Sequence, residues 1–568
     1  MITVGLAHDL FVSSAAVVKD GQVVAAIAEE RLNRQKQYKG FPALALKECL
    51  RMAGATLNDV SAVASGWNPT RHLEGLNYRL SNNSRSRAEY LYAIPNMILG
   101  HLGHKSGEWI EETMDSLDTR IQYYDHQLAH LANAFYLSEF DRAATFSADG
   151  RGERETACWG WADRKSGFHK LGQVYFPNSL GLLYGSVTQY LGFRPDSDEW
   201  KVMALASYGE PNNNYYSLMR PLVEVNAGTG QFYVDQKFLS FADLEIYSGR
   251  FYTPEFVERF GAPRDKDGPI EKRHYDIAWA LQRVFEESMT ACLTSLQRQT
   301  GESRLVAAGG CLMNSVYNGK VTQQTPFKEL FVSSCPDDSG ISVGAALLAY
   351  HRLAEKPQFG AHPHNYWGPS YDHQILESLR NSKISFQQIE DPSRTAAELL
   401  AKGLLVGWFQ GRMEFGQRAL GNRSILADPR RLDVKDIVNA AVKYRESFRP
   451  FAPAILAESV HDYFHAEAGG RVPFMERVYQ FREGMGEKVP AVVHADGSGR
   501  LQSVERKHNP RFYDLIKAFM SLTGVPIVLN TSFNLNGEPI VCTPSDAIRT
   551  FYSCGLDALV LGDYLVRK

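Results

Sequence analysis

Short apolar runs at the start of the chain are separated by polar and glycine-containing turn signals. Residues 3–7 and 13–18 form two such runs, and Lys19-Asp20-Gly21 separates the second run from a third at 23–28. Asp-Gly between apolar runs is a strong hairpin signal, because both turn positions accept a positive φ. The pattern predicts a strand followed by a β-hairpin.

A similar unit recurs at residues 142–162. One apolar strand leads to Asp149-Gly150, and another runs from Thr156 to Trp161. Helical patterns follow both units, including an amphipathic stretch over 276–298. Two strand units of this kind, each followed by helices, indicate a duplicated α/β fold.

Two histidines, His126 and His130, lie four residues apart in a run with helical apolar spacing. Both imidazoles should therefore leave the same helix face, which is a metal-ligand spacing. Position 127 is Gln, so the pair lacks the glutamate of a zinc-protease helix. This difference argues against hydrolysis by a general base on the helix.

Carboxylates follow two of the predicted strands. Asp149 ends the strand 142–148 and precedes a glycine-rich turn, and the stretch 329–340 repeats this pattern with Asp337 and Asp338. Carboxylates at strand ends followed by glycines commonly build metal–phosphate sites. Two histidines with one or two aspartates suit iron(II), zinc or manganese, and the ligands alone do not choose among them.

The order of these elements resembles the actin/hexokinase/Hsp70-type ATPase architecture, whose two halves clasp a nucleotide. In that fold the Asp-Gly turn, here with Gly150, holds phosphates, and a glycine-rich turn in the second half holds adenosine. Gly309, Gly310 and Asn314 match the second turn. Lys201 is either a solvated surface lysine or a phosphate contact. Residues 211–270 lack a clean period, and we expect an insertion that covers the site.

A segment with Pro and Gly begins near residue 355, and a new α/β pattern starts at about Leu376. We therefore expect two domains, 1–355 and 356–568. The second domain contains dense polar clusters. In some of them glycines lie next to arginines, and in another Asn, Thr and Ser lie at the end of a predicted strand. Such groups offer forked donors and hydrogen bonds to phosphate or carboxylate oxygens. The candidates from these clusters include Arg423, Asn530, Thr531 and Asn534.

Composition narrows the class of protein. The chain has 568 residues, 44% hydrophobic and 22% charged, which is enough for two or more globular domains. A formal net charge of −3 gives no basic field for nucleic acid or an anionic membrane. Without a signal-peptide pattern or a spanning apolar run, a cytoplasmic enzyme is expected. Seven scattered cysteines argue against a disulfide framework or a thiolate zinc site.

Three motifs carry a more specific resemblance, to the O-carbamoyltransferases of natural-product biosynthesis, which include nodulation-factor, cephem and tobramycin-modifying enzymes. The motifs are Gly-Arg-Met-Glu-Phe-Gly-Gln-Arg-Ala-Leu-Gly-Asn-Arg-Ser at 411–424, Phe-Arg-Pro-Phe-Ala-Pro at 448–453, and Asn-Thr-Ser-Phe-Asn with Gly-Glu-Pro-Ile-Val at 530–541. The resemblance implies an ATPase-type metal-binding domain followed by a YrdC-like α/β domain. It also implies that the second domain makes carbamoyladenylate from carbamoyl phosphate and ATP. The first domain would then pass the carbamoyl group to a hydroxyl of a small molecule and release AMP.

The resemblance also implies roles for individual residues. The iron(II) ligands would be His126, His130, Asp149 and Asp338. Contacts to carbamoyl phosphate and ATP would come from Arg418, Lys443, Arg449, Arg500 and Ser532, and His8 would lie nearest the acceptor hydroxyl. Mg²⁺ is a further candidate cofactor. The sequence departs from the family at Gln417, where proline is usual, and at His8-Asp9, which lies three residues upstream of the family's His-Asp pair.

Other functions use related folds. Threonylcarbamoyl transfer to tRNA shares both domain types, but the slightly negative net charge argues against a tRNA-binding surface. A sugar kinase or a chaperone-like ATPase would form ADP, whereas the carbamoyltransferase would form AMP and pyrophosphate. A metal-dependent binding module is a further alternative.

Overall fold

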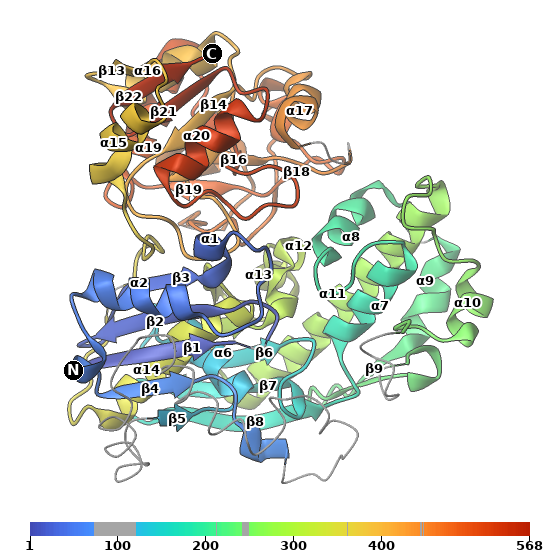
Figure 1. Cartoon of the computed structure of the whole chain (residues 1–568). Helices are drawn as coiled ribbons and strands as arrows, with labels where there is room; N and C mark the ends of the chain where they lie inside the picture. The colour runs from blue at the N-terminus through green and yellow to red at the C-terminus, as the bar shows by residue number, and fades with distance from the viewer. Residues whose placement is uncertain are drawn as a thin grey trace. The chain divides into compact units, whose positions relative to one another are not determined.

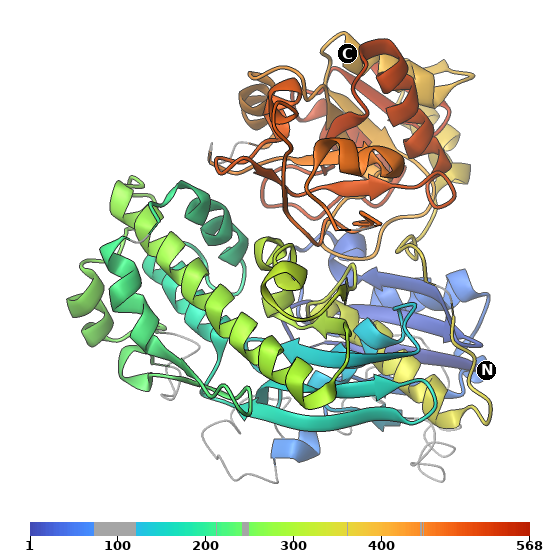
Figure 2. The same ribbon diagram turned by 180° about the vertical axis from the view of Figure 1, so that it is seen from behind.

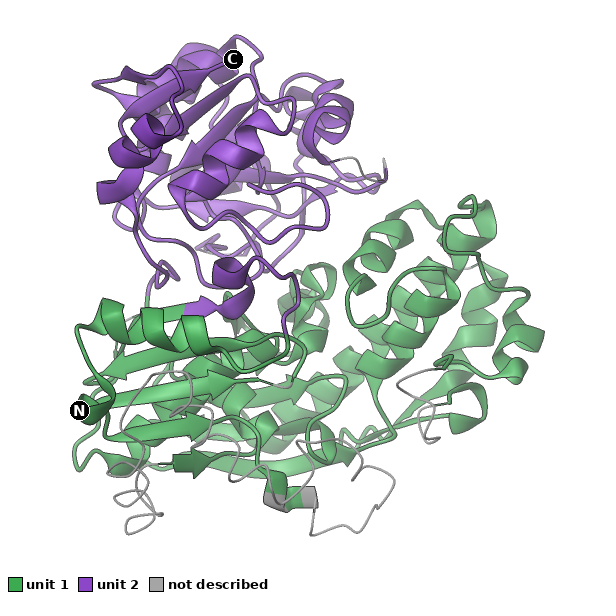
Figure 3. Cartoon of the chain, in the orientation of Figure 1, with its two compact units in different colours: residues 1–26, 39–362 green, residues 27–38, 363–568 purple. Residues whose placement is uncertain are grey.

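The protein is described here by a computed structural model that forms two compact units (Figure 3). Unit 1 contains residues 1–26 and 39–362, and unit 2 contains residues 27–38 and 363–568. The sequence predicts a boundary at 355/356, whereas these units divide at 362/363 and the short segment 27–38 belongs to unit 2. The structure describes residues 1–8, 10–72, 121–211, 213–240, 249–360, 362–443, 446, 448–467 and 469–568.

The first sheet of unit 1 has the strand order β3-β2-β1-β4-β5. β1 pairs antiparallel with β2 and parallel with β4, which pairs parallel with β5. The hairpin turn is Asp20-Gly21, with φ of 49° and 81°, so the predicted turn is confirmed. The strands are β1 Ile2–Ala7, β2 Ser14–Lys19, β3 Gln22–Ala28, β4 Ala62–Ser65 and β5 Ile121–Tyr123.

The second sheet repeats this topology. Its order is β12-β11-β6-β7-β8, with β6 antiparallel to β7 and parallel to β11, which is parallel to β12. Each sheet thus has its first strand at the centre, a meander on one side and two parallel strands on the other. The predicted duplicated ATPase-type fold is confirmed. The strands are β6 Arg142–Ala148, β7 Glu155–Asp163, β8 Gly167–Tyr175, β11 Arg304–Ala308 and β12 Glu329–Val332.

Two helices, α6 (His126–Phe135) and α14 (Ile341–Leu353), lie between the sheets (Figure 1). α14 packs on β1 and α6, and α6 packs on β6 and β11. The packing is close because two glycines remove side chains where backbones meet. A Cβ on Gly5 would overlap the carbonyl oxygen of Ser342, and a Cβ on Gly344 would overlap that of Ala129. Both helices are almost entirely buried.

The predicted helix over 276–298 is confirmed as α11 (Lys272–Thr300), the long lime helix beside β6 and β7 in Figure 2. The expected insertion at 211–270 forms short elements, several of which pack on α11 or on one another. Other helices of unit 1 are α2 Ala43–Ala53, α7 Leu180–Tyr190, α8 Glu199–Leu205, α9 Asn214–Met219, α10 Pro254–Phe260, α12 Ser315–Asn318 and α13 Val321–Gln324. The short strands β9 Val223–Val225 and β10 Phe232–Val234 form a two-stranded ribbon.

Unit 2 is a second α/β domain, as predicted, with a mixed sheet of order β13-β22-β21-β14-β15-β20-β16-β19. Its core is formed by the buried central strands and the apolar faces of α16 and α19. The sheet strands are β13 Gln387–Gln388, β14 Val406–Phe409, β15 Arg423–Ala427, β16 Ala452–Leu456, β19 Gln502–Val504, β20 Ile527–Ser532, β21 Ala558–Leu561 and β22 Tyr564–Arg567. The ribbon strands are β17 Tyr479–Gln480 and β18 Ser498–Gly499.

The helices of unit 2 include α1, which comes from the N-terminal part of the chain. They are α1 Glu29–Asn33, α15 Ile375–Asn381, α16 Pro392–Ala401, α17 Val434–Val438, α18 Val460–Tyr463, α19 Pro510–Thr523 and α20 Pro544–Tyr552. Within the described ranges, none of the helices combines the length and the apolar composition that a membrane span requires.

The close packing of α14 on α6 predicts that Gly344→Ala destabilises unit 1. The added methyl would meet the backbone of α6, and overpacking of this kind lowers the free energy of unfolding by about 1–3 kcal/mol. Gly185→Ala is the matched control, because Gly185 also lies in a helix but has room for a methyl. The control should be neutral or stabilising by up to about 1 kcal/mol. Urea unfolding measures both, and equal effects of the two variants would contradict this account of the packing.

Candidate active site

The two predicted histidines lie at the start of α6 and are fully buried. Their Nε2 atoms are 3.2 Å apart, as expected for positions i and i+4 of one helix. The first turn is anchored by Glu153, whose carboxylate accepts from the backbone N–H of His126 at 3.0 Å and of Asn68 at 2.7 Å. A carboxylate at a helix N-terminus accepts hydrogen bonds from otherwise unpaired N–H groups, and its negative charge interacts favourably with the helix dipole.

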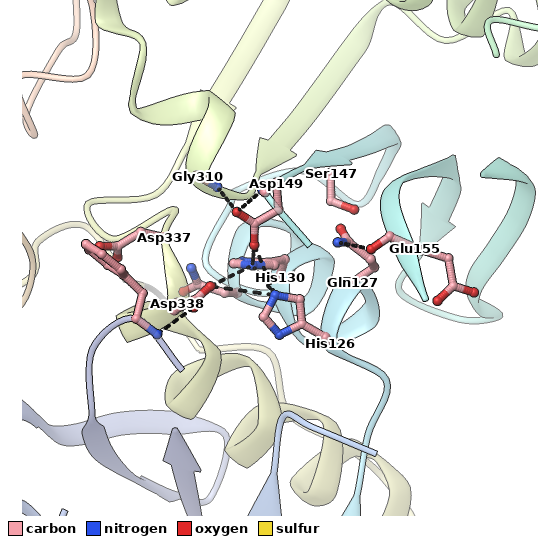
Figure 4. Close-up of polar contacts among 12 residues, drawn as sticks. His126, Gln127, His130, Ser147, Asp149, Glu155, Gly310, Asp337 and Asp338 are labelled. Atoms are coloured by element: carbon pink, nitrogen blue, oxygen red, sulfur yellow. Dashed lines mark hydrogen bonds and ion pairs between the residues drawn. The ribbon is translucent and has the colours of Figure 1, made fainter. Parts of the chain in front are cut away.

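Two aspartates converge on these histidines (Figure 4). Asp149 Oδ2 is 3.0 Å from Nε2 of both His126 and His130. Asp338 Oδ1 is 3.6 Å from the same two nitrogens. One potential ligand atom from each of the four side chains lies within 4.8 Å of the others. The structure thus brings together the four residues that the sequence proposed as metal ligands.

Strand register explains how distant residues meet. β6 and β11 are parallel, and Ser147 pairs with Ala308, so Asp149 and the Gly309-Gly310 turn leave the same edge of the sheet. Asp149 Oδ1 accepts from the N–H groups of Gly150 at 2.7 Å and Gly310 at 3.2 Å. Gly309 has a φ of +92° and lies against the backbone of Ala148, so a side chain there would clash.

Asp338 is held by a different part of unit 1. Its Oδ2 accepts from the backbone N–H of Phe11 at 3.0 Å. Asp337 turns elsewhere and accepts from Ser339 Oγ at 2.6 Å, so it supports the turn and Asp338 contributes to the cluster. The contact with Phe11 also ties the loop after β1 to the candidate ligands.

Burial and charge favour a cation at this cluster. Burial alone would lower the pKa of His130, but its hydrogen bonds and attraction to Asp149 and Asp338 raise that pKa to about 10. Burial likewise opposes ionisation of Asp149, yet the hydrogen bonds from the two histidines hold its pKa well below the usual range. Burial raises the pKa of Glu153 to about 7. The negative charges of Asp149 and Asp338, which hold a proton on His130, would also favour a divalent cation in place of that proton.

The donor set fits a transition-metal ion. Two imidazole nitrogens and two carboxylate oxygens suit iron(II), zinc or manganese, so the set does not single out iron. The Nδ1 atoms of both histidines are buried and form no hydrogen bond with the described residues. In both histidines it is Nε2 that faces the carboxylates, so Nε2 is the ring atom available as a metal ligand.

Three other predicted residues of unit 1 have different surroundings. Lys201, in α8, forms an ion pair with Asp198 at 3.2 Å. Asn314 caps α12 by accepting from Tyr317 N–H, and its amide donates to Gln282 Oε1 at 2.8 Å. Both side chains thus have structural partners. His8 follows β1, is 1% exposed, and packs edge-on against Phe41 with ring centroids 5.5 Å apart.

In unit 2 the predicted residues Lys443, Ser532 and Asn534 meet. The ammonium of Lys443 donates to the carbonyl oxygens of Ser532 at 2.6 Å and Asn534 at 2.9 Å, and to Asn534 Oδ1 at 2.8 Å. Lys443 is 4% exposed. These hydrogen bonds to oxygens hold the buried ammonium in place, as a buried charge requires. Thr531 precedes this group at the end of β20 and is half-buried.

The loop before β15 is shaped by one buried carboxylate. Glu414 Oε1 accepts from the N–H groups of Leu420 at 2.7 Å, Asn422 at 2.8 Å and Arg423 at 3.3 Å. Asn530 supports the same loop through its amide, which donates to Ala419 O at 3.2 Å. The backbone that follows Arg418 is therefore held by several hydrogen bonds, and Glu414 ties it to the start of the same loop.

Arg423 differs from the expectation of a ligand contact. It is fully buried, lies over the ring of Phe409, and donates to the carbonyl oxygens of Gln410 at 2.6 Å and Gly411 at 3.1 Å. Because carbonyl oxygens take up its guanidinium donors, Arg423 holds the loop together. Gly-Arg spacing alone does not distinguish this role from anion binding.

The remaining predicted cations, Arg418, Arg449 and Arg500, are half-buried. Arg449 pairs with Glu446 at 3.1 Å. Burial, together with the charge of Arg500, lowers the pKa of His494 to about 4. No sequence pattern indicated a role for Glu153 or Glu414. Glu153 does close the motif Asp149-Gly-Arg-Gly-Glu153, and Glu414 lies inside the glycine-arginine cluster.

Comparison with known proteins places this architecture in a family. The model described as "Carbamoyltransferase N-terminus" matches residues 3–347, and "Carbamoyltransferase C-terminus" matches residues 397–568. Both halves of this α/β enzyme are therefore matched, and the chain belongs to the carbamoyltransferase family.

Individual relatives agree with this assignment. The chain is 36% identical to nodulation protein NolNO of Sinorhizobium fredii, over 99% of this chain and 79% of that protein. It is 34% identical to 3'-hydroxymethylcephem-O-carbamoyltransferase of Amycolatopsis lactamdurans, over 52% of this chain and 54% of that protein. An uncharacterized protein of Synechocystis is 35% identical over 99% of this chain and 95% of its own length.

The convergence of His126, His130, Asp149 and Asp338 predicts about one divalent ion per purified chain. His130→Ala should lose most of it, because one imidazole cannot replace a chelating pair. His169→Ala is the control, since its Nε2 contacts Ser166 and its ring stacks on Trp161. Elemental analysis by mass spectrometry measures the metal. Full metal content in His130→Ala would show that these side chains do not form the centre.

Proposed function

We propose that this chain is an O-carbamoyltransferase that makes carbamoyladenylate from carbamoyl phosphate and ATP and transfers the carbamoyl group to a hydroxyl of a small molecule. Family membership and the activity named for the cephem relatives support the reaction class. The observation that carries the proposal is the presence of two different polar centres. Unit 1 contains the cluster of two histidines and two aspartates at positions 126, 130, 149 and 338, and unit 2 contains the buried ammonium of Lys443.

Activation is assigned to unit 2. Carbamoyl phosphate and water would give carbamate and phosphate, and a carbamate oxygen would then attack the α-phosphorus of ATP. The bond from that phosphorus to the bridging oxygen breaks, and pyrophosphate leaves. Lys443, Arg418 and Arg449 would hold the phosphates and stabilise the negative charge that develops on the leaving oxygen. The buried position of Lys443 strengthens this effect, because water screens a buried charge less.

Transfer is assigned to unit 1. The acceptor hydroxyl would attack the carbamoyl carbon, the bond from that carbon to the adenylate oxygen breaks, and AMP leaves. The hydroxyl proton needs an acceptor, and His8 is the candidate because the loop that follows it is tied to Asp338 through Phe11. A divalent metal held by the four side chains would supply positive charge to the adenylate phosphate.

If activation and transfer use different centres, substitutions in unit 2 should impair carbamoyladenylate formation, and substitutions in unit 1 should impair carbamoyl transfer. Lys443→Ala or Arg449→Ala should lower carbamoyl-phosphate-dependent release of pyrophosphate by roughly ten- to a hundredfold, because each removes a charge-assisted phosphate contact. Metal content should stay near the wild-type value. His126→Ala should abolish transfer to the acceptor and still release some pyrophosphate. A coupled pyrophosphate assay and mass spectrometry of the acceptor measure the two steps.

Synthetic carbamoyladenylate supplies the matching control. Added to the enzyme with acceptor, it should restore product formation by Arg449→Ala and fail to restore it for His126→Ala. The opposite rescue pattern, or equal loss of pyrophosphate release in both variants, would show that activation and transfer do not use separate centres.

The role of His8 gives a further prediction. His8→Asn should slow carbamoyl transfer by roughly a hundredfold to ten-thousandfold, because general base catalysis contributes about that factor. Pyrophosphate release and metal content should not change. Rates of transfer from synthetic carbamoyladenylate measure the effect. A variant that transfers at the wild-type rate would remove His8 from the mechanism.

A further inference from the structure

Residues 27–38 interrupt unit 1 in sequence and belong to unit 2 (Figure 3). The chain enters them without a loop, since β3 ends at Ala28 and α1 begins at Glu29. Three consecutive charged residues of α1, Glu29, Glu30 and Arg31, are 3%, 6% and 5% exposed. Charged side chains are rarely buried this deeply unless they are paired or hydrogen-bonded. Their partners therefore indicate what the segment does.

Arg31 contacts the loop that carries Arg418. Its Nη2 donates to the carbonyl oxygen of Gly416 at 3.1 Å, and its Nη1 pairs with Glu30 at 3.0 Å. Gly416 stands two residues before Arg418 and has a φ of +132°, a conformation that favours glycine. The carbonyl that Arg31 holds thus fixes the backbone just before the predicted anion-binding arginine.

Arg34 contacts the loop that follows β20. Its Nη1 donates to Ile540 O at 2.6 Å and its Nη2 to Pro539 O at 2.7 Å. The neighbouring carbonyl of Glu538 accepts from the amide of Asn534 at 2.7 Å. Asn534 Oδ1 in turn accepts from Lys443. One chain of hydrogen bonds and adjacent residues therefore runs from Arg34 to the buried ammonium.

The segment is internally braced, as a positioning element must be. Glu30 Oε2 accepts from Gln37 N–H at 2.7 Å, which closes the turn after α1. Arg34 ends α1 in the left-handed region, with a φ of 62° and its N–H bonded to Glu30 O at 3.1 Å. A non-glycine residue is uncommon in this region. The side chain of Arg34 donates two hydrogen bonds to carbonyl oxygens outside residues 27–38.

We propose that residues 27–38 position the two anion-binding loops of unit 2. Arg31 sets the backbone before Arg418, and Arg34 sets the loop whose Asn534 holds Lys443. The inference rests on the proposed function, because it assigns these loops to carbamoyl phosphate and ATP. It adds that activation depends on a segment from the N-terminal part of the chain, continuous with β3 of the first sheet. Arg31 and Arg34 act through other residues and are positioning residues.

The test uses the full-length chain and two readouts. Hydrogen exchange followed by mass spectrometry reports on the loops directly. Arg31→Ala should speed exchange in peptides that cover 411–424, and Arg34→Ala should do so in peptides that cover 533–541. Each variant should also lower kcat/KM for carbamoyl-phosphate-dependent pyrophosphate release by roughly tenfold, as expected for a lost charge-assisted bond. Transfer from synthetic carbamoyladenylate should stay within about twofold of wild type.

A conservative variant and a surface variant serve as controls. Arg34→Lys keeps the charge but replaces a two-pronged donor with one ammonium, so it should recover part of the rate. Arg394→Ala removes an arginine of unit 2 whose side chain is 71% exposed and pairs with Glu398. This control should match wild type in both readouts.

The outcomes separate the inference from the proposed function. Unchanged exchange and unchanged pyrophosphate release in both arginine variants would overturn the inference. Faster exchange spread throughout unit 2 would also overturn it, because the arginines would then support general stability. A wild-type chain that releases no pyrophosphate with carbamoyl phosphate would instead overturn the proposed function, whatever the exchange pattern.

Discussion

Two half-buried carboxylates beside two buried imidazoles favour a cation, and the arrangement of unit 1 can be understood from this preference. Asp149 and Asp338 face His126 and His130 within a few ångströms, and the side chains of the two aspartates are only 13% and 14% exposed, so water screens them weakly. Without positive charge, the repulsion and desolvation of the two carboxylates would oppose the fold. A proton on His130 or a divalent ion satisfies this preference, and the ion does so with the ligand chemistry that the four side chains offer.

The fold brings these four groups together through backbone contacts. Glycine at Gly5 and Gly344 lets α14 lie against β1 and α6, so the helix that carries the histidines is held between two sheets. Backbone N–H groups of Gly150, Gly310 and Phe11 then hold the carboxylates. Unit 2 also holds buried charges through hydrogen bonds: carbonyl and amide oxygens accept from the ammonium of Lys443, and backbone N–H groups donate to the carboxylate of Glu414.

Much of the fold and part of the candidate site could be predicted, because they depend on patterns within short stretches of the sequence. The hairpin at Asp20-Gly21 and the repeated strand units follow from short apolar runs and Asp-Gly turn signals. Helix α11 and the shared face of His126 and His130 follow from helical spacing of apolar residues. Other features depend on pairings between distant backbone groups, which leave no periodic signal. Glu153 and Glu414 accept only backbone N–H bonds from their described partners, so in sequence they look like ordinary surface acids. Segment 27–38 looks like the continuation of the first hairpin, yet its arginines bind carbonyls about 385 and 505 residues further along the chain.

In the proposed function, one chain both forms carbamoyladenylate and transfers its carbamoyl group. Phosphorus NMR of the metal-loaded wild-type enzyme with ATP and carbamoyl phosphate is the decisive experiment, because it distinguishes all the phosphate products. The account predicts AMP, pyrophosphate and phosphate, formed only when both substrates are present, with carbamoylated product appearing in step with AMP once a hydroxyl acceptor is added. Formation of ADP, or carbamoyl transfer without ATP cleavage to AMP, would contradict it.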